Sequence, residues 1–276
     1  YAMGLLQSGA VAGTIFGPFL GGILAEFLTF HQVFWITSVV IGIVTISVIF
    51  FVKEQFVKLT DKTKISFKGG MTMILQTQPL PALFTIGFLI QFSLMSAQPQ
   101  MSLYVQEIHP SGQYIAFFAG LVPAVTGVAN MLASPWLGRL GDNKGSQYVL
   151  FYSMIGATVF LIPQAFVHSI GGLLFFRFMF GLAIGGLLPS VNALIRQSAP
   201  KGKESATYGY SNSALFLGNM IGPILGGFLA SFTSIRVVLL LGAVLFLMST
   251  IWMKHVFENK VEEGKRLLLK RNMLPK

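Results

Sequence analysis

Long apolar segments recur along the chain and restrict it to one class of fold. Eight segments of about 20 residues carry almost no charged side chains, and they fall at 4–28, 33–52, 81–105, 114–137, 148–167, 171–195, 206–231 and 236–253. Segments of this length cross a bilayer as helices; they are too long, and lack the alternation, for barrel strands. The sequence predicts an all-α, polytopic membrane helical bundle.

Composition excludes the other large classes of protein. Only 10% of the 276 residues are charged, whereas soluble domains carry roughly 25%. Disordered chains need low hydrophobicity and high charge, but here 54% of residues are hydrophobic. Because the chain has no cysteine, disulfides, thiolate metal sites and cysteine nucleophiles are excluded. No metal-binding or nucleotide-binding pattern occurs either, so we expect no cofactor and no enzyme activity.

The basic residues predict how the helices are oriented. Of the 19 Lys and Arg, 17 lie at 53–78, 138–147, 196–205 and in the tail from 254, which alternation of the spans puts on one side. Cytoplasmic loops carry such an excess. We therefore expect a multi-pass cell-membrane protein with loop 53–80 and the C-terminus in the cytoplasm. This placement also explains the net charge of +10 without nucleic acid as a partner.

An internal repeat predicts the domain organisation. The sequence GPFLGGILA at 17–25 recurs as GPILGGFLA at 222–230, six spans later. Repeats are typical of secondary transporters, and this period implies roughly twelve spans, of which about eight are in this chain. We expect the last two helices of an N-terminal bundle at 1–52, a cytoplasmic basic linker at 53–80, a C-terminal six-helix bundle at 81–253 and a basic tail at 254–276. Segment 4–52 should then expose apolar faces that the missing N-terminal helices of its own chain would cover.

Two kinds of glycine motif are candidate gating elements. Proline inside a helix removes a backbone hydrogen bond, and glycine allows a second backbone to approach. One copy would fit an ordinary kink equally well, but two corresponding copies favour a gating role for Gly17, Pro18, Gly21, Gly22, Gly222 and Pro223. The segment GRLGDNKG at 138–145 predicts a short cytoplasmic turn in which Asp142 accepts backbone N–H groups at a helix N-terminus. Gly138 and Gly145 flank it, and a solvated loop is the alternative.

Charged residues inside or near the spans are candidates for coupling. Arg177 lies within a span, where a charge is a functional candidate, although it could instead reach toward the interface. Glu26 and Glu107 lie near the outer ends of their spans. Either could take up protons, and solvation of a helix end is the alternative for both.

Polar and aromatic residues recur at helical spacing and are candidate substrate contacts. Lipid offers amide groups no hydrogen-bond partners, while Met and aromatic groups suit adaptable binding of apolar, often cationic molecules. Hydrogen bonding between helices without a ligand is the alternative. The candidates are Gln7, Thr14, Phe88, Gln91, Met95, Gln98, Asn192, Tyr208, Asn212, Phe216 and Asn219, with Gln91 and Asn212 expected on opposite sides of the C-terminal bundle.

Together these residues resemble the major facilitator superfamily, and within it the drug–proton antiporters of Gram-positive bacteria. The helix with Gly17-Pro18 resembles the fifth-span antiporter signature, and the resemblance covers essentially the whole chain as spans five to twelve. Residues 138–145 resemble the superfamily's loop motif, with Asn143 and Ser146-Gln147 in place of the usual basic residues. The resemblance implies that Asp142 meets the start of span five, around Ala2 to Leu5, when the inner gate closes.

The sequence therefore predicts a secondary active transporter that works by alternating access. Its partners would be the lipid bilayer, protons and small lipophilic or cationic molecules, with proton-coupled multidrug efflux by a monomer as the expected activity. A metabolite or sugar transporter of the same superfamily is one alternative. A non-transporting membrane receptor or a membrane-embedded enzyme is the other.

Overall fold

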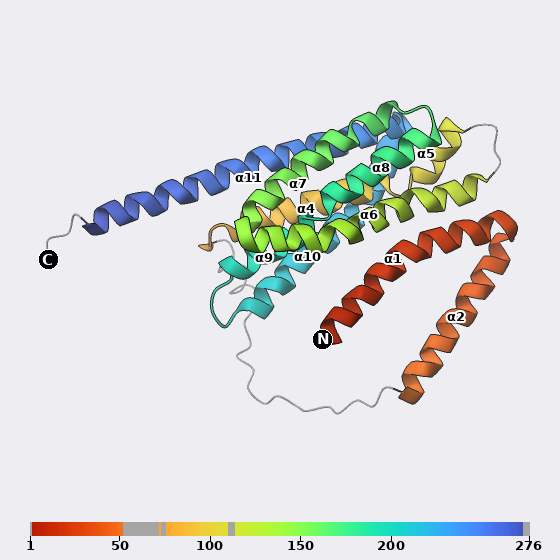
Figure 1. Cartoon of the computed structure of the whole chain (residues 1–276), viewed down its shortest axis with the longest axis horizontal. Helices are drawn as coiled ribbons and strands as arrows, with labels where there is room; N and C mark the ends of the chain where they lie inside the picture. The colour runs from red at the N-terminus through yellow and green to blue at the C-terminus, as the bar shows by residue number, and fades with distance from the viewer. Residues whose placement is uncertain (1, 52–71, 73–75, 110–113, 273–276) are drawn as a thin grey trace.

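The computed structural model describes residues 2–51, 72, 76–109 and 114–272, and only the backbone of residues 2–12, 14, 15 and 258–272. Within these ranges all regular secondary structure is helical (Figure 1). The helices are α1 (Ala2–Phe27), α2 (Phe30–Phe51), α4 (Leu80–Ala97), α5 (Met101–Ile108), α6 (Ile115–Lys144), α7 (Ser146–Leu161), the 3-10 helix η1 (Pro163–Phe166), α8 (Ile170–Ile184), α9 (Leu187–Ser198), α10 (Glu204–Phe232) and α11 (Ile235–Asn272).

The helices have the dimensions of membrane spans. Seven helical segments in the described part of the chain are long and apolar enough to cross a bilayer, and α1 adds the shorter apolar segment Phe16–Phe27. The prediction of an all-α polytopic bundle is confirmed. We call the end of the bundle at the α6–α7 turn, predicted to be cytoplasmic, the inner end, and the opposite end, at the α1–α2 turn, the outer end.

Two predicted spans are broken rather than continuous. The span expected at 81–105 divides into α4 and α5 around Pro99, because proline lacks the N–H that a helix interior requires and its ring clashes with the preceding turn. The span expected at 171–195 divides into α8 and α9 at Gly185 and Gly186. A Cβ at Gly185 would lie 2.9 Å from Cβ of Ala133 on α6. Glycine thus allows the close approach at that break.

The predicted inner turn at 138–145 is shorter than the sequence suggests. Helix α6 continues through Gly138 and Asp142 to Lys144, and α7 begins at Ser146. Only Gly145 connects them, with φ of 103°, a conformation that glycine adopts without steric cost. The prediction that Asp142 lies in the turn, at a helix N-terminus, is therefore wrong: Asp142 lies in the last helical turn of α6.

The bundle core lies where α4 meets α10 and α11, and where α7 meets α8 and α11. Its largest fully buried side chains include Leu83, Ile86 and Ile90 of α4, Met154 of α7 and Phe246 of α11. Helices in lipid gain little from the hydrophobic effect, so close packing of small and apolar side chains holds them together.

Helices α1 and α2 form a hairpin beside this bundle. Helix α1 packs against α6. These two helices, α1 and α6, lie close together near the end of α1 and farther apart toward the beginning of α1 (Figure 1). Helix α2 buries none of its residues and exposes Phe34, Trp35 and Ile49, among others. The apolar faces expected from segment 4–52 are therefore present on α2.

Two predicted segments differ or lie outside the described part. The linker predicted at 53–80 is mostly outside the described residues. The tail predicted from residue 254 does not start a separate segment, since α11 continues as one helix to Asn272 and extends beyond the bundle (Figure 1).

Candidate functional site

Helices α4 and α10 make a close backbone contact through glycines of α10. A Cβ at Gly222 would lie 2.9 Å from the carbonyl oxygen of Phe92, and one at Gly226 would overlap the backbone of Ser96. Gly218 is equally close to α4, since its Cβ would lie 2.7 Å from the carbonyl oxygen of Phe88. From the sequence, Gly222 was predicted to have a gating role and Gly218 and Gly226 were not, although their spacing of four residues was the signal.

The predicted substrate residues of α4 and α10 adjoin along this contact. A Cβ at Gly218 would lie 3.1 Å from Cβ of Gln91, and one at Gly222 would lie 3.1 Å from Cβ of Met95. Gln91 and Asn212 therefore belong to neighbouring helices. The prediction that they lie on opposite sides of the bundle is wrong, because glycine spacing brings α4 and α10 into direct contact.

Two buried amide oxygens in this region lack a partner. Oε1 of Gln91 and Oδ1 of Asn219 are buried, and neither accepts a hydrogen bond from the described residues. A buried acceptor left unpaired costs about 1–3 kcal/mol. Because neither oxygen is accessible in this conformation, a water or a bound molecule could donate to it only in a conformation that exposes it.

The surroundings of these amides are aromatic and apolar. The ring of half-buried Phe88 lies 6.0 Å from that of Phe92, and half-buried Met95 follows on the same helix. Phe216 is 67% exposed, while Asn212 and Gln98 are also exposed, the latter at the α4–α5 break. This combination can contact an apolar molecule and offer it neutral hydrogen-bond acceptors.

A polar hollow of about 300 Å³ opens at the inner end. It brings together Asp142 of α6, Asn192 of α9 and Tyr208 of α10, and the hydroxyl of Tyr208 donates to the carbonyl oxygen of Asn192 at 3.2 Å. Gly138 also lines it, as does Arg196, which the sequence analysis counted only as a topology residue. The hollow contains one acidic and one basic side chain from different helices.

The predicted contact between Asp142 and the start of α1 involves residues whose side chains lie outside the described part. Asp142 is exposed, and the beginning of α1 lies apart from the bundle (Figure 1). The side chains of Gln7 and Thr14 are likewise outside the described residues.

The first glycine motif contacts α6 through one of its three glycines. A Cβ at Gly22 would lie 2.9 Å from Cα of Gly120, whereas Gly17 and Gly21 have no atom within 4 Å of such a Cβ. The rings of Phe19 and Phe117 extend the contact, with centroids 6.2 Å apart. Helix α1 continues through Pro18 and α10 through Pro223.

Glu26 makes a polar contact at the outer end of the same interface. Its Oε2 accepts hydrogen bonds from the backbone N–H groups of Ala116 at 3.1 Å and Phe117 at 3.4 Å. These are first-turn donors of α6, which otherwise lack a helical partner. The sequence analysis named Glu26 but gave it no such partner.

Arg177 is buried inside the bundle rather than extended toward water. It is 8% exposed, its Nη2 donates to the sulfur of Met101, and its guanidinium carbon lies 5.8 Å from the ring centroid of Phe180. Its Nε has no partner among the described residues. The attraction between the buried cation and the aromatic ring is favourable, but it replaces only part of the hydration that the guanidinium loses on burial.

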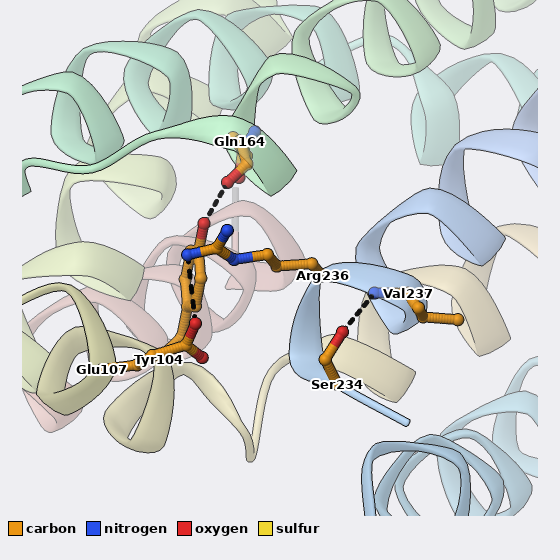
Figure 2. A network of polar contacts seen from close by, with 6 residues as sticks. All are labelled: Tyr104, Glu107, Gln164, Ser234, Arg236 and Val237. Carbon is orange, nitrogen blue, oxygen red and sulfur yellow. Dashed lines mark hydrogen bonds and ion pairs between the residues drawn. The ribbon is translucent and has the colours of Figure 1, made fainter. Parts of the chain in front are cut away.

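Near the outer end, a cluster of polar side chains links α5, α11 and η1 (Figure 2). Arg236 of α11 pairs with Glu107 of α5 at 3.1 Å. The hydroxyl of the buried Tyr104 donates to the carbonyl oxygen of Gln164 at 2.6 Å. Glu107 thus has a basic partner within the bundle, unlike Glu26.

Comparison with known proteins decides the family. Residues 1–160 and 83–271 match the sequence profile of the Major Facilitator Superfamily. The chain belongs to the Major Facilitator Superfamily. The two matches overlap at 83–160, in keeping with the internal repeat of such transporters.

Three relatives are similar over most of the chain. It is 40% identical over 246 residues to the uncharacterized MFS-type transporter YuxJ of Bacillus subtilis, with 88% of this chain and 62% of YuxJ covered. It is 33% identical to the multi-drug resistance efflux pump PmrA homolog of Lactococcus lactis, covering 91% and 62%. Identity to the multidrug resistance protein MdtG of Dickeya zeae is 34%, covering 88% and 60%. The chain therefore spans about 60% of the length of these relatives.

A solved structure supports the fold. A crystal structure of a mutant of the peptide transporter POT in complex with sulfate superposes with a TM-score of 0.59, over 69% of this chain and 38% of that one. At 18% sequence identity, this likeness extends to the helical arrangement alone.

Proposed function

We propose that the chain is part of a secondary transporter that exports small lipophilic, often cationic molecules in exchange for protons. The observation that carries the proposal is the pair of buried, unpartnered amide oxygens of Gln91 and Asn219 beside aromatic and Met side chains. Lipid cannot supply a hydrogen-bond donor there. A ligand that brings apolar surface and a donor would satisfy both requirements in a conformation that exposes these oxygens. Two similar proteins are named for multidrug resistance.

We assign the substrate-binding surface to the residues of α4 and α10 along their contact. Phe88, Gln91, Met95 and Gln98 contribute from α4 and its end, and Asn212, Phe216 and Asn219 from α10. Adaptable Met and aromatic surface tolerates molecules of different shape. Gln7 and Thr14 would contribute from the opposite half, and Asn192 and Tyr208 from the inner hollow.

Gating follows from the glycine contacts. The motifs at Gly17 and Gly222 lie on helices whose backbones meet other helices at van der Waals distance, and such contacts switch between discrete arrangements. Asp142 would close the inner end against the opposite half, with Gly138 and Gly145 allowing the compact turn. The two halves at 1–52 and 81–253 would rock as units about the central surface.

Coupling to protons would use Glu26, with Arg177 as a buried cation that responds to charge in the bundle. Buried charges in membrane spans commonly mark proton relays and substrate paths. The positive-inside distribution of Lys and Arg supports a cell-membrane location with the 53–80 segment and the C-terminus in the cytoplasm. We propose that the unit is a monomer.

Transport by purified protein tests this function. The protein that carries residues 1–276, together with the preceding spans that the repeat predicts, would be reconstituted in vesicles with a fluorescent lipophilic cation. Dye movement against its gradient should require a proton gradient and stop when an ionophore removes it. Dye movement that ignores the proton gradient, or none with any lipophilic cation, would contradict the proposal.

A further inference from the structure

The residue at the N-cap position of α6 does not cap the helix with its side chain. Tyr114 occupies the N-cap position with φ of 63° and its side chain makes no capping hydrogen bond. The first turn of a helix presents free N–H groups and the positive end of the helix dipole. Those groups are normally satisfied by a Ser, Thr, Asp or Asn at the N-cap position, a role that Tyr114 does not fill.

Glu26 supplies the missing cap from a helix 90 residues away in sequence. Its carboxylate oxygen accepts from Ala116 and Phe117, the second and third residues of α6. The contact joins α1, assigned by the repeat to the N-terminal half, to α6 of the C-terminal bundle. The internal repeat does not predict it, since the residue that corresponds to Glu26 in the second copy is Ser231.

The two N–H groups of this helix end are the hydrogen-bond donors that Glu26 has among the described residues. Glu26 lines a hollow of about 400 Å³. The other lining residues are Ile23 and Phe27 of α1, Tyr114 at the N-cap position of α6, and Phe117 and Phe118 of α6. No Lys or Arg lines it; Tyr114 is the other titratable side chain there. Beyond Phe118 lies the ring of His109, at 5.9 Å between centroids, and His31 begins the exposed end of α2.

Separation of the outer ends of the two halves would have to break this contact. The backbones of α1 and α6 touch at Gly22 and Gly120, only about one helical turn from Glu26. Separation would take the Glu26 carboxylate away from its two N–H donors. Protonation of that carboxylate before separation would remove its charge. A neutral carboxyl is a weaker acceptor and has no net attraction to the helix dipole.

We propose that Glu26 is a proton-released latch between the two halves. While the outer end is closed, the Glu26 carboxylate binds the start of α6. When that carboxylate takes up one proton from the outer solvent, the contact breaks and the two halves can separate at the outer end. This deepens the proposed function, on which it rests, by assigning to Glu26 the step at which proton entry opens the outer side.

Distances between spin labels test the latch in the complete transporter. The chain contains no cysteine, so labels can be attached at the exposed positions His31→Cys at the start of α2 and Leu103→Cys on α5. In the wild type, lowering the outer pH should raise the population with the longer distance. Glu26→Gln, which keeps the shape and removes the charge, should raise the ratio of open to closed about two- to thirtyfold at neutral pH. It should also remove the pH response.

Glu107→Gln is the matched control. Glu107 is also an outer-end acid, but its partner Arg236 belongs to the same bundle, so neutralising it should leave the distances between the halves and their pH response unchanged. The latch is overturned if Glu26→Gln gives the wild-type distances and pH response, or if Glu107→Gln has an equal effect. Should Glu26→Gln fail to fold, the wild-type pH response decides: distances independent of pH overturn the latch.

The label distances and dye export fail independently. Labels that respond as stated, without export of any dye, would support the latch and contradict the proposed function. Proton-driven dye export without a label response would support the proposed function and contradict the latch.

Discussion

At the scale of single residues, the informative groups are polar atoms that the bundle buries without satisfying. Oε1 of Gln91, Oδ1 of Asn219 and Nε of Arg177 are three of them. Inside a bilayer such atoms cannot form hydrogen bonds with water. Each unpaired atom therefore lowers the free energy of unfolding, whereas an apolar side chain would not. Substitutions that remove them therefore separate a structural role from a functional one.

Replacing Gln91 or Asn219 by Ala should change which dyes are exported while leaving the folded protein about as stable as before. An unpartnered oxygen contributes no hydrogen bond to the fold, so its removal leaves no new unpaired group. Relative export rates across a panel of lipophilic cations, with melting temperature measured in parallel, would test this. Thr85→Val is the control on α4, since that hydroxyl already donates to the carbonyl oxygen of Pro81. A loss of stability larger than that of the control would mean that the amides pair with other helices.

Arg177→Met should retain or raise thermal stability while reducing proton-driven transport by about tenfold or more. A buried charge without an acidic partner among the described residues carries a desolvation cost, which an apolar side chain of similar length avoids. Melting temperature and transport rate are the two readouts, and Arg177→Lys tests whether charge alone suffices. If Arg177→Met melts several degrees lower with unchanged transport per folded molecule, the arginine is structural.

Asp142→Asn should shift the transporter toward the conformation that is open at the inner end. Asp142 lies near the C-terminal end of α6, where its charge opposes the helix dipole at a cost of about 0.3–1 kcal/mol. The substitution should therefore not destabilise the bundle. Labelling of Ala193→Cys, which lines the inner hollow, would measure access, with the exposed neighbour Asn143→Ala as control. Equal labelling in all three proteins would leave Asp142 without a gating role.

At the scale of helices, glycine decides which elements approach each other most closely. Gly218, Gly222 and Gly226 repeat every four residues on α10 and all face α4. Residues four apart lie on one face of a helix, so the three glycines form a continuous path for the α4 backbone. Without side chains on that path, the two helices reach a separation that larger residues would prevent.

Gly226→Ala should therefore destabilise the bundle by about 1–3 kcal/mol, since its Cβ would overlap the backbone of Ser96, which cannot yield easily. Gly209→Ala on the same helix is the matched control, because no atom lies within 4 Å of its Cβ. That change should be neutral or stabilise by up to about 1 kcal/mol through helix propensity. Unfolding of both variants in detergent micelles by denaturant would compare them. Equal effects would contradict close packing at Gly226.

At the scale of the whole molecule, the two copies of the glycine motif use different faces. In the second copy Gly222 and Gly226 pack on α4, while the corresponding Gly17 and Gly21 are open. In the first copy Gly22 packs on α6 instead. The first copy thus contacts a helix assigned to the opposite half, and the second contacts a helix of its own half.

Cross-linking α1 to α6 should stop transport by locking the outer end. The rings of Phe19 and Phe117 lie 6.2 Å apart across the two halves. Cysteines at these positions, joined by a short thiol cross-linker that a reductant can cleave, should block dye export until cleaved. Phe228 and Phe232 are both exposed and their ring centroids lie 4.8 Å apart on α10, so the same treatment there joins no two helices and should leave export active. Full export by the cross-linked first pair would exclude α1–α6 separation from the cycle.

The sequence by itself determined the fold class, the approximate positions of the spans and the family. The fold class and the spans follow from apolar length, which reflects the solvent that each segment meets, whereas the family was indicated by the glycine and loop motifs that resemble it. It also identified Glu26, Arg177, Gln91 and Asn219 as unusual, since a polar group in an apolar segment stands out without any structure.

The tertiary structure alone decided which helices meet and what each polar group touches. Residues that face lipid and residues that face another helix are equally apolar, so periodicity could not show that α4 adjoins α10 or that Gly22 contacts Gly120. The cap that Glu26 provides, the Met101 and Phe180 surroundings of Arg177 and the shared hollow of Asp142 and Arg196 join residues from helices distant in sequence. Such contacts depend on the packed arrangement of all the helices, which no local segment encodes.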